Sequence, residues 1–231
     1  MPELPPQQSE RLPLAMRRAE EKLAKLPPDP TASRLLDAAR KAGSTTQRVM
    51  WLQRAASAWA KPMQGVAACR KGCDHCCHIP LTISKVEADV IGKAIGRSPR
   101  KPTAAVRLAE LENDSAAWQG AQAELQAAAP DTPCPFLVDH ACSIYESRPL
   151  PCRILINLDD DELLCRKVDG VDVPVPYADA MVFKAHYMAL QPAGVLADIR
   201  DFFPDAVPCS EDLQALQAGT GSVDRATRGV G

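Results

Sequence analysis

The sequence predicts a mainly α-helical fold: a small helical domain with a few short strands and cysteine-rich loops wrapped round a metal centre. Three observations lead to this prediction. Several stretches carry apolar residues at helical spacing and end at glycine or proline. Aromatic residues make up only 4% of the 231 residues, so the core must be built mostly from Ala, Leu, Val and Ile. The nine cysteines fall largely into groups with the spacing of metal ligands.

The first quarter of the chain is expected to be helical after a short flexible start. Residues 1–13 are expected to be flexible because four prolines punctuate them: Pro2, Pro5, Pro6 and Pro13. Helices are then predicted over three stretches that end at proline or glycine, at residues 14–26, 31–42 and 45–60. One face of the third stretch carries apolar residues that should pack into the core: Trp51, Leu52, Ala55 and Trp59.

Shorter elements are expected around the cysteines. Residues 79–83 read as an extended piece, and Ser84 with Glu87 forms a capping box that opens a helix to about Ile95. Residues 103–129 predict one long Ala-rich helix, or two with a break near Asn113. Short apolar runs follow at 136–138 and 143–145, and helices are expected at 177–190 and 192–203.

These patterns divide the chain into four segments. Residues 1–13 are the flexible N-terminus, and residues 14–62 form a helical extension. Residues 63–210 are expected to form the cysteine-cluster metal-binding domain. Residues 211–231 are expected to be a C-terminal helix or flexible tail.

Charge and hydropathy limit the partners that the protein is expected to bind and the compartment in which it is expected to lie. Lys and Arg number 27 against 29 Asp and Glu, which gives a formal charge of −2. There is no basic field to hold nucleic-acid phosphates, and no apolar run approaches the roughly 18–20 residues that span a bilayer. No signal peptide is recognisable at the N-terminus. We therefore expect a cytoplasmic protein with reduced thiols, whose partner is a metal ion or cluster and not nucleic acid or membrane.

The cysteines form two groups that are far apart in sequence. Four lie within nine residues: Cys69, Cys73, Cys76 and Cys77. Three more follow in a second group: Cys134, Cys142 and Cys152. Local C-x₂₋₄-C spacing brings several soft donors to one point, and Gly72 permits the backbone angles that such a loop needs. Adjacent Cys76 and Cys77 cannot easily reach one mononuclear centre, so the pair indicates a second metal or a polynuclear centre.

Other residues near the cysteines have more than one interpretation. Four cations lie beside cysteines and could offset thiolate charge: Arg70, Lys71, Arg148 and Arg153. His75 and His78 could ligate metal, although the cysteines suffice without them. The acidic run 159–162 could attract a hard divalent ion, but such a run is more often a solvated turn. Cys209 is expected to be a free or buried thiol without a role.

The order of these motifs resembles the YkgJ-type cysteine-cluster family, whose domain is described as chelating zinc or iron or as containing an Fe–S cluster. The resemblance rests on C-x₃-C-x₂-C-C, then C-P-F-L, then C-x-I-Y-E-x-R-P-x-x-C-R, and covers residues 69–153. It implies that the seven grouped cysteines are ligands, with Cys165 the best candidate for an eighth. Tyr145, Arg148 and Pro149 belong to the same signature.

Three functions remain open from the sequence. The first is a metal-binding protein that stores, delivers or senses an iron–sulfur cluster or zinc or iron ions, in a polynuclear centre or two sites, with iron–sulfur slightly favoured. The second is an Fe–S-dependent enzyme. Some flagellin lysine methylases carry a similar domain, and C-x₃-C-x₂-C is also the spacing of radical-SAM enzymes, although the alternating strands and helices of their barrel are missing here. The third is a structural zinc domain that acts as an interaction module.

Overall fold

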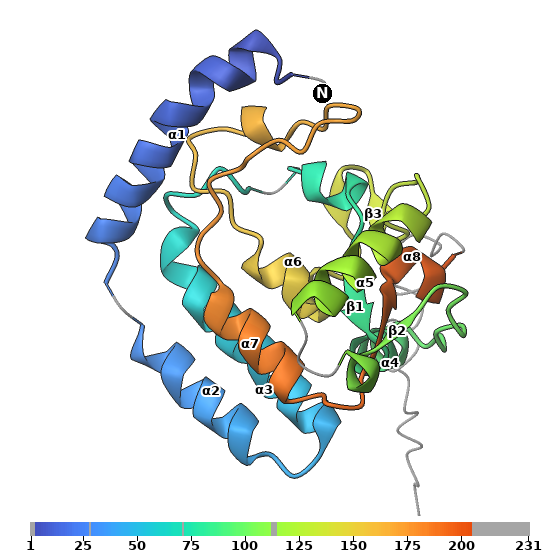
Figure 1. The fold of residues 1–231 in the computed structure, drawn as a ribbon. Coiled ribbons are helices and arrows are strands. Elements are labelled where there is room, and N and C mark those ends of the chain that lie inside the picture. Colours follow the sequence, from blue (N-terminus) through green and yellow to red (C-terminus); the bar gives the residue numbers. More distant parts are fainter. Residues whose placement is uncertain (1–2, 28, 71, 112–114, 205–231) are drawn as a thin grey trace, which may run out of the picture.

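The computed structural model describes residues 3–27, 29–70, 72–111 and 115–204 (Figure 1). It is mainly helical, as predicted. The helices are α1 (Pro6–Lys25), α2 (Pro30–Lys41), α3 (Thr45–Ala60), α4 (Lys85–Ala94), α5 (Ser115–Ala128), α6 (Leu150–Ile154), α7 (Met181–Ala189) and α8 (Ile199–Phe202). The strands are β1 (Thr82–Ser84), β2 (Val106–Arg107), β3 (Leu137–Val138), β4 (Ala141–Cys142) and β5 (Val195–Asp198). The predicted C-terminal tail and Cys209 lie outside the described residues.

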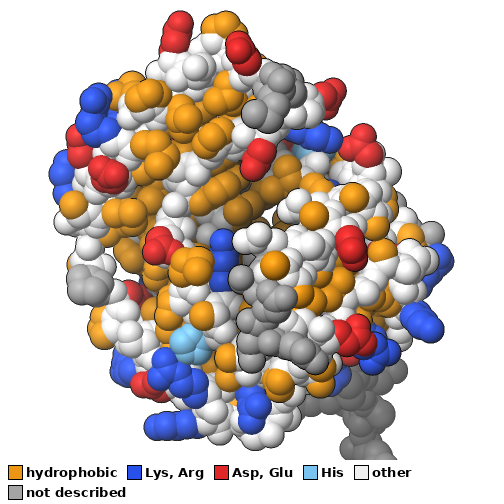
Figure 2. Space-filling model, in the orientation of Figure 1, with side chains coloured by type: hydrophobic (Ala, Val, Ile, Leu, Met, Phe, Trp, Pro, Cys, Tyr) orange, Lys and Arg blue, Asp and Glu red, His pale blue; other side chains and the backbone are white. Residues whose placement is uncertain are grey.

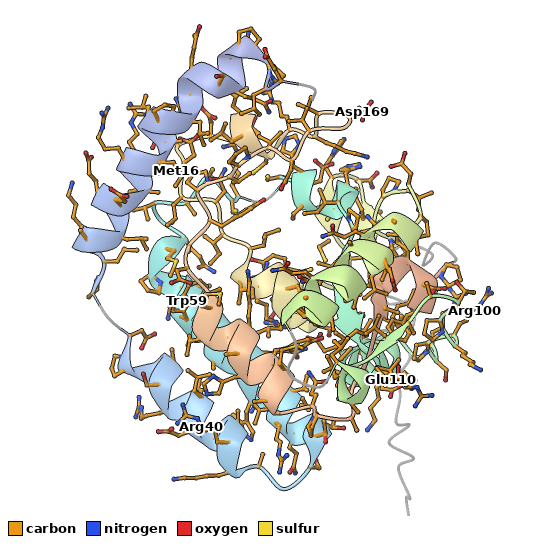
Figure 3. The ribbon with its side chains drawn as sticks, in the orientation of Figure 1. Met16, Arg40, Trp59, Arg100, Glu110 and Asp169 are labelled. Carbon is orange, nitrogen blue, oxygen red and sulfur yellow. The ribbon has the colours of Figure 1, made fainter. Side chains whose placement is uncertain are left out.

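The first hydrophobic core lies between α2, α3, α6 and α7, which run side by side in Figure 1. Leu52 and Ala55 of α3 are buried in it, and Trp51 packs against it, as the apolar face of that helix predicts. Trp59, labelled in Figure 3, packs against Phe183 of α7 with ring centroids 5.1 Å apart. Such an aromatic contact adds to the stability that the buried area itself supplies.

The second core lies against a small antiparallel sheet with the strand order β1-β5-β2. Ile83 of β1 pairs with Ala197 of β5, and both side chains are fully buried. Phe136 and Phe202 are also fully buried in this core, which Cys134, Cys142 and Cys152 contact from its edge. The cysteine segments are therefore supported by apolar packing on one side.

Three expectations about the elements differ from the structure. The first helix starts at Pro6, so residues 6–13 are helical; proline is favoured at a first helical position, and Pro13 is accommodated inside the helix. Residues 106–110 form β2 and a 3₁₀ turn ahead of α5, where helix was expected. Residues 192–203 contain β5 before the short α8. In the last two cases strand pairing overrides local helix propensity, because β2 pairs with β5 and β5 pairs with both β1 and β2.

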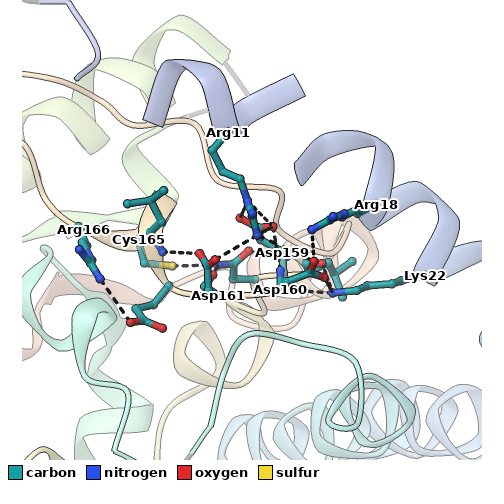
Figure 4. Close-up of polar contacts among 12 residues, drawn as sticks. Arg11, Arg18, Lys22, Asp159, Asp160, Asp161, Cys165 and Arg166 are labelled. Atoms are coloured by element: carbon teal, nitrogen blue, oxygen red, sulfur yellow. Dashed lines mark hydrogen bonds and ion pairs between the residues drawn. The ribbon is translucent and has the colours of Figure 1, made fainter. Parts of the chain in front are cut away.

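Helix α1 is attached to the rest of the chain by ion pairs with the acidic run (Figure 4), by hydrogen bonds from the Gln8 amide and by packing of Ala19. Arg11 donates two hydrogen bonds of 2.8 and 3.0 Å to the carboxylate of Asp159, which is fully buried. Arg18 and Lys22 both pair with Asp160. The run is therefore a docking site for α1, and neither a solvated turn nor a vacant ion site.

Loss of Arg11 should release α1. The Arg11→Ala variant leaves the buried Asp159 carboxylate without its guanidinium partner, which should weaken docking by about 2 kcal/mol. Hydrogen exchange should then show faster exchange of the α1 amides, with the amides of α3 unchanged. Arg17→Ala, on the exposed face of the same helix, is the matched control. Equal protection of α1 in both variants would contradict the ion-pair attachment.

A buried carboxylate joins four helices in the centre of the molecule. Glu87 of α4 is fully buried, and its oxygens accept hydrogen bonds from the Gln53 amide (2.9 Å), the Leu150 N–H (2.6 Å) and the Tyr187 hydroxyl (2.6 Å). These donors come from α3, α6 and α7. The Ser84 side chain caps α4 as predicted, but the Ser84 N–H donates to Tyr187 instead of to Glu87.

Replacing Glu87 with alanine should lower the free energy of unfolding by about 3 kcal/mol, because three buried donors lose their acceptor. Urea titration of the reduced protein measures this change. Asp89→Ala on the same helix removes only an exposed ion pair with Lys85 and should change the free energy by less than about 0.5 kcal/mol.

The Glu87→Gln variant tests the charge separately from the shape. Burial raises the pKa of Glu87, so its contribution to stability is fully present below its unfolded pKa and is lost as the pH rises through its folded pKa. The stability of the wild type relative to Glu87→Gln should therefore fall as the pH rises. A difference that grows with pH would show that ionised Glu87 stabilises the fold.

Candidate metal centre

The first cysteine segment is a tight loop followed by a 3₁₀ turn at His75–His78. Gly72 has φ +89°, the left-handed conformation that the sequence predicts for it. The Cys73 N–H donates to the Arg70 carbonyl at 3.0 Å, and the Cys77 N–H donates to the Asp74 carbonyl at 2.7 Å. These turns place four cysteines within a short length of backbone.

The second segment meets the first through backbone and side-chain hydrogen bonds. The Cys134 N–H donates to the Cys77 carbonyl at 2.7 Å. The buried Arg200 guanidinium donates to the carbonyls of Cys77 and Ile79 at 3.0 Å each, and to the Thr132 carbonyl at 2.5 Å. Arg200 is itself held by a buried ion pair with Asp198. The two cysteine segments therefore meet in the structure, and one arginine of α8 joins them.

Cys142 lies in a hairpin formed by β3 and β4. The two residues of its turn, Asp139 and His140, have φ of 47° and 58°. Two successive positive φ angles are typical of the type I′ turn, which matches the twist of paired strands. Cys152 lies within α6, and the N–H of the first residue of this helix, Leu150, donates to Glu87.

A small cavity is enclosed where these elements meet. It holds about 30 Å³, and its lining includes five cysteines: Cys76, Cys77, Cys134, Cys142 and Cys152. Side chains such as Leu81, Phe136 and Ile199 form its apolar walls. That volume is roughly the space of one water in the liquid, so the cavity suits an ion and excludes an organic ligand. Figure 2 shows one face of the molecule, which is hollowed at its centre and lined there by hydrophobic side chains.

Asn157 joins two further cysteines outside this cavity. Its backbone N–H lies 3.4 Å from the Cys69 Sγ, and its side-chain amide donates to the Cys165 Sγ at 3.2 Å. Asn157 is fully buried, and its amide also donates to the Asp161 carbonyl at 3.1 Å. Cys165 therefore lies near Cys69 of the first cysteine segment, in the 3₁₀ turn that follows the acidic run.

Hydrogen bonding and charge set the thiol pKa values. A hydrogen bond from the Cys77 thiol lowers the pKa of Cys76 to about 7, with a further contribution from the Arg148 cation, and the same bond raises the pKa of Cys77. Burial raises the pKa of Cys134 to about 11 and that of Cys165 to about 12. In the metal-free protein Cys76 is thus the described thiol with a pKa near neutrality.

The cations near the cysteines have different roles. Arg148 lines the cavity, lies 4.0 Å from the ring centroid of Tyr145, and has a buried Nε without a hydrogen-bond partner among the described residues. Arg70 forms an ion pair with Glu162 at 2.8 Å. Arg153 donates to the Arg148 carbonyl at 2.8 Å and holds the loop before α6. Lys71 lies outside the described residues. Arg148 therefore lines the cavity and is placed to balance thiolate charge there.

The histidines make contacts with other partners. His78 lies 3.7 Å from the Asp74 carboxylate, and His140 contacts the same carboxylate at 2.7 Å. The hydrogen bond with His140 lowers the pKa of Asp74. His186 accepts a hydrogen bond from Arg40 at 2.9 Å. His75 has a half-buried place in the 3₁₀ turn.

The geometry leaves the eight described cysteines as free thiols. In the part of the chain that the structure describes, no three Cys, His, Asp or Glu side chains form a group positioned to hold a metal ion. The surroundings of each sulfur therefore distinguish the candidate ligands. The sequence does not predict the support that three residues give to the cysteine segments: Asn157, Arg200 and Glu87, the last of which it places only in a helix cap.

The fold and the site define a mainly helical protein with a thiol-lined centre of the kind that binds soft or borderline metal ions. Comparison with protein families agrees with this class. Residues 68–168 match the CxxCxxCC family, described as a "putative zinc- or iron-chelating domain". The match supports metal binding as the function of this segment and extends the resemblance beyond Cys165. No curated protein and no solved structure matches the chain. None of the described helices is long and apolar enough to cross a membrane.

Cys76 should be the fastest thiol to react in the reduced, metal-free protein. Its alkylation by iodoacetamide should rise with pH around a midpoint near 7, because the thiolate is the nucleophile. Cys77→Ala removes the donor that stabilises this thiolate, so the midpoint should move to higher pH and the rate at pH 7 should fall about tenfold. Site-resolved mass spectrometry measures the rate at Cys76. Cys73→Ala is the control, and an unchanged midpoint in Cys77→Ala would contradict the thiol–thiolate pair.

Proposed function

We propose that this protein binds zinc or iron through its clustered cysteines and serves in metal handling or sensing in a reducing compartment such as the cytoplasm. The observation that carries the proposal is the cavity. Its five cysteines come from two segments, and 56 residues separate Cys77 of the first segment from Cys134 of the second. Three or four converging soft donors are what zinc and iron sites require.

The residues around the cavity fit a thiolate-bound cation. Ligation deprotonates cysteines, and several thiolates around one divalent ion leave a net negative charge. Arg148 supplies a positive charge at the cavity and a buried N–H that has no acceptor within the described part of the chain. A ligand sulfur is an acceptor of suitable charge for it. The small volume favours single ions, and an iron–sulfur cluster is the second candidate because its inorganic sulfides need more room.

The access to the site favours metal handling over a purely structural role. Cys69 and Cys76 are exposed, so part of the thiol set can be reached by a ligand or a metal donor from solution. A metal that only staples a fold is normally enclosed by its four ligands. An enzyme that uses an open coordination position is the alternative function, and the exposure of Cys76 is the feature that favours it.

Metal content of the anaerobically purified protein tests the proposal. We expect bound zinc or iron by mass spectrometry of the elements, and a lower metal content in a variant with serine at both Cys77 and Cys152. Removal by a strong chelator should expose thiols to Ellman's reagent in the wild type. Wild-type protein without bound metal, even after incubation with Zn²⁺ or Fe²⁺ under reducing conditions, would refute metal binding. A brown protein with acid-labile sulfide would identify the iron–sulfur alternative.

A further inference from the structure

The eight described cysteines do not share one environment. Five line the small cavity, and the other three are outside its lining: Cys69, Cys73 and Cys165. The cavity walls are apolar, whereas Cys69 and Cys165 lie beside the buried polar residue Asn157. One centre made from all eight sulfurs would have to bridge these two surroundings.

The outer three are held together by contacts that do not involve the cavity. Asn157 donates one N–H to Cys69 and another to Cys165, and these two sulfurs come from segments 96 residues apart. The ion pair between Arg70 and Glu162 ties the loop that carries Cys73 to the turn that carries Cys165. N–H donors of this kind orient a thiolate and stabilise its charge.

Cys76 lies between the two groups. It lines the cavity yet is exposed, which places it at the cavity rim. Its charge affects thiols on both sides, because it contributes to the raised pKa of Cys152 and to that of Cys165. Its neighbour Cys77 faces the cavity and is tied by its carbonyl to Cys134. Adjacent Cys76 and Cys77 cannot easily ligate the same single ion. This difficulty disappears if each of the two side chains ligates a different ion.

The count then favours two complete sites. A tetrahedral zinc or iron site takes four thiolates, and the groups as found hold five and three. Moving Cys76 from the cavity to the outer group gives four and four. From this we propose two separate metal sites of four thiolates each: an inner site of Cys77, Cys134, Cys142 and Cys152, and an outer site of Cys69, Cys73, Cys76 and Cys165. This inference rests on the proposed function and states how its ligands divide.

The two sites should differ in how easily they exchange metal. Three of the inner four cysteines, Cys134, Cys142 and Cys152, pack against a hydrophobic core, while the outer site includes both cysteines that are exposed in the described part of the chain. A chelator reaches an exposed site first, so the outer ion should leave faster than the inner one. The outer site is therefore the one suited to receive or deliver an ion.

Zinc counting in matched variants tests the division. The reduced full-length chain is loaded with Zn²⁺, desalted, and its zinc per chain is measured. We expect two zinc ions in the wild type, one in Cys165→Ser and one in Cys134→Ser, and none in the double variant. Cys209→Ser removes a thiol that belongs to neither proposed ligand set and should retain two. Release to a chromogenic chelator should show a fast and a slow phase in the wild type, with the fast phase absent from Cys165→Ser.

Cobalt spectra separate lost sites from lost folding. Each single variant loaded with Co²⁺ should keep the intense visible bands of a tetrahedral thiolate site at half the wild-type amplitude, which requires a folded remaining site. Loss of all metal in either single variant, or a wild-type content of one ion, would overturn the two-site division while leaving metal binding intact. A wild type that binds no metal would instead refute the proposed function on which the division rests.

Discussion

The buried carboxylate of Glu87 is the interaction on which the arrangement of the metal centre depends. A buried charge is costly unless its hydrogen-bonding capacity is used, and here three donors from α3, α6 and α7 surround it. One of these donors, the Leu150 N–H, is at the first residue of α6, and Cys152 follows two residues later. The direction in which α6 leaves the core, and hence the place of Cys152, is fixed by a residue whose own helix contributes no cysteine.

Arg200 has the complementary role on the other side of the cavity. Its guanidinium donates to carbonyls of both cysteine segments, and Asp198 balances its charge. Glu87 thus positions the end of the second segment, while Arg200 joins the start of that segment to the first. Both groups are ionisable, buried and satisfied by several partners, so they specify one arrangement and disfavour others that would leave a polar group unpaired. The thiols can therefore be brought together before any metal binds.

The sequence was sufficient to predict features that depend on neighbouring residues, such as helix ends. It did not predict features that depend on contacts between segments far apart in the chain. The boundaries of α2, α3 and α4 follow from caps and stops such as Ser84 and Gly43, and the ligand candidates follow from cysteine spacing. By contrast, residues 195–198 become a strand because β1 and β2 lie beside them. Residues 6–13 are helical, and Arg11 lies opposite an acidic run that is 148 residues away. No periodicity in either segment encodes its partner. Nothing in the sequence around Asn157 predicts its contacts with the sulfurs of Cys69 and Cys165 either.

The distribution of apolar packing bears on whether the metal is structural. The core between α2, α3 and α7 includes no cysteine among its buried or adjoining residues, and neither does the smaller cluster that receives Ala19 of α1. Folding of these parts is thus supported by burial alone, and the binding free energy of a metal is not needed to form them. The core around Phe136 differs, because three cysteines of the proposed inner site pack against it. A structural role for metal is therefore confined to that half of the chain. The proposed outer site includes the exposed Cys69 and Cys76, so an ion held there can leave with little cost in hydrophobic packing, and its binding free energy remains available for transfer or sensing.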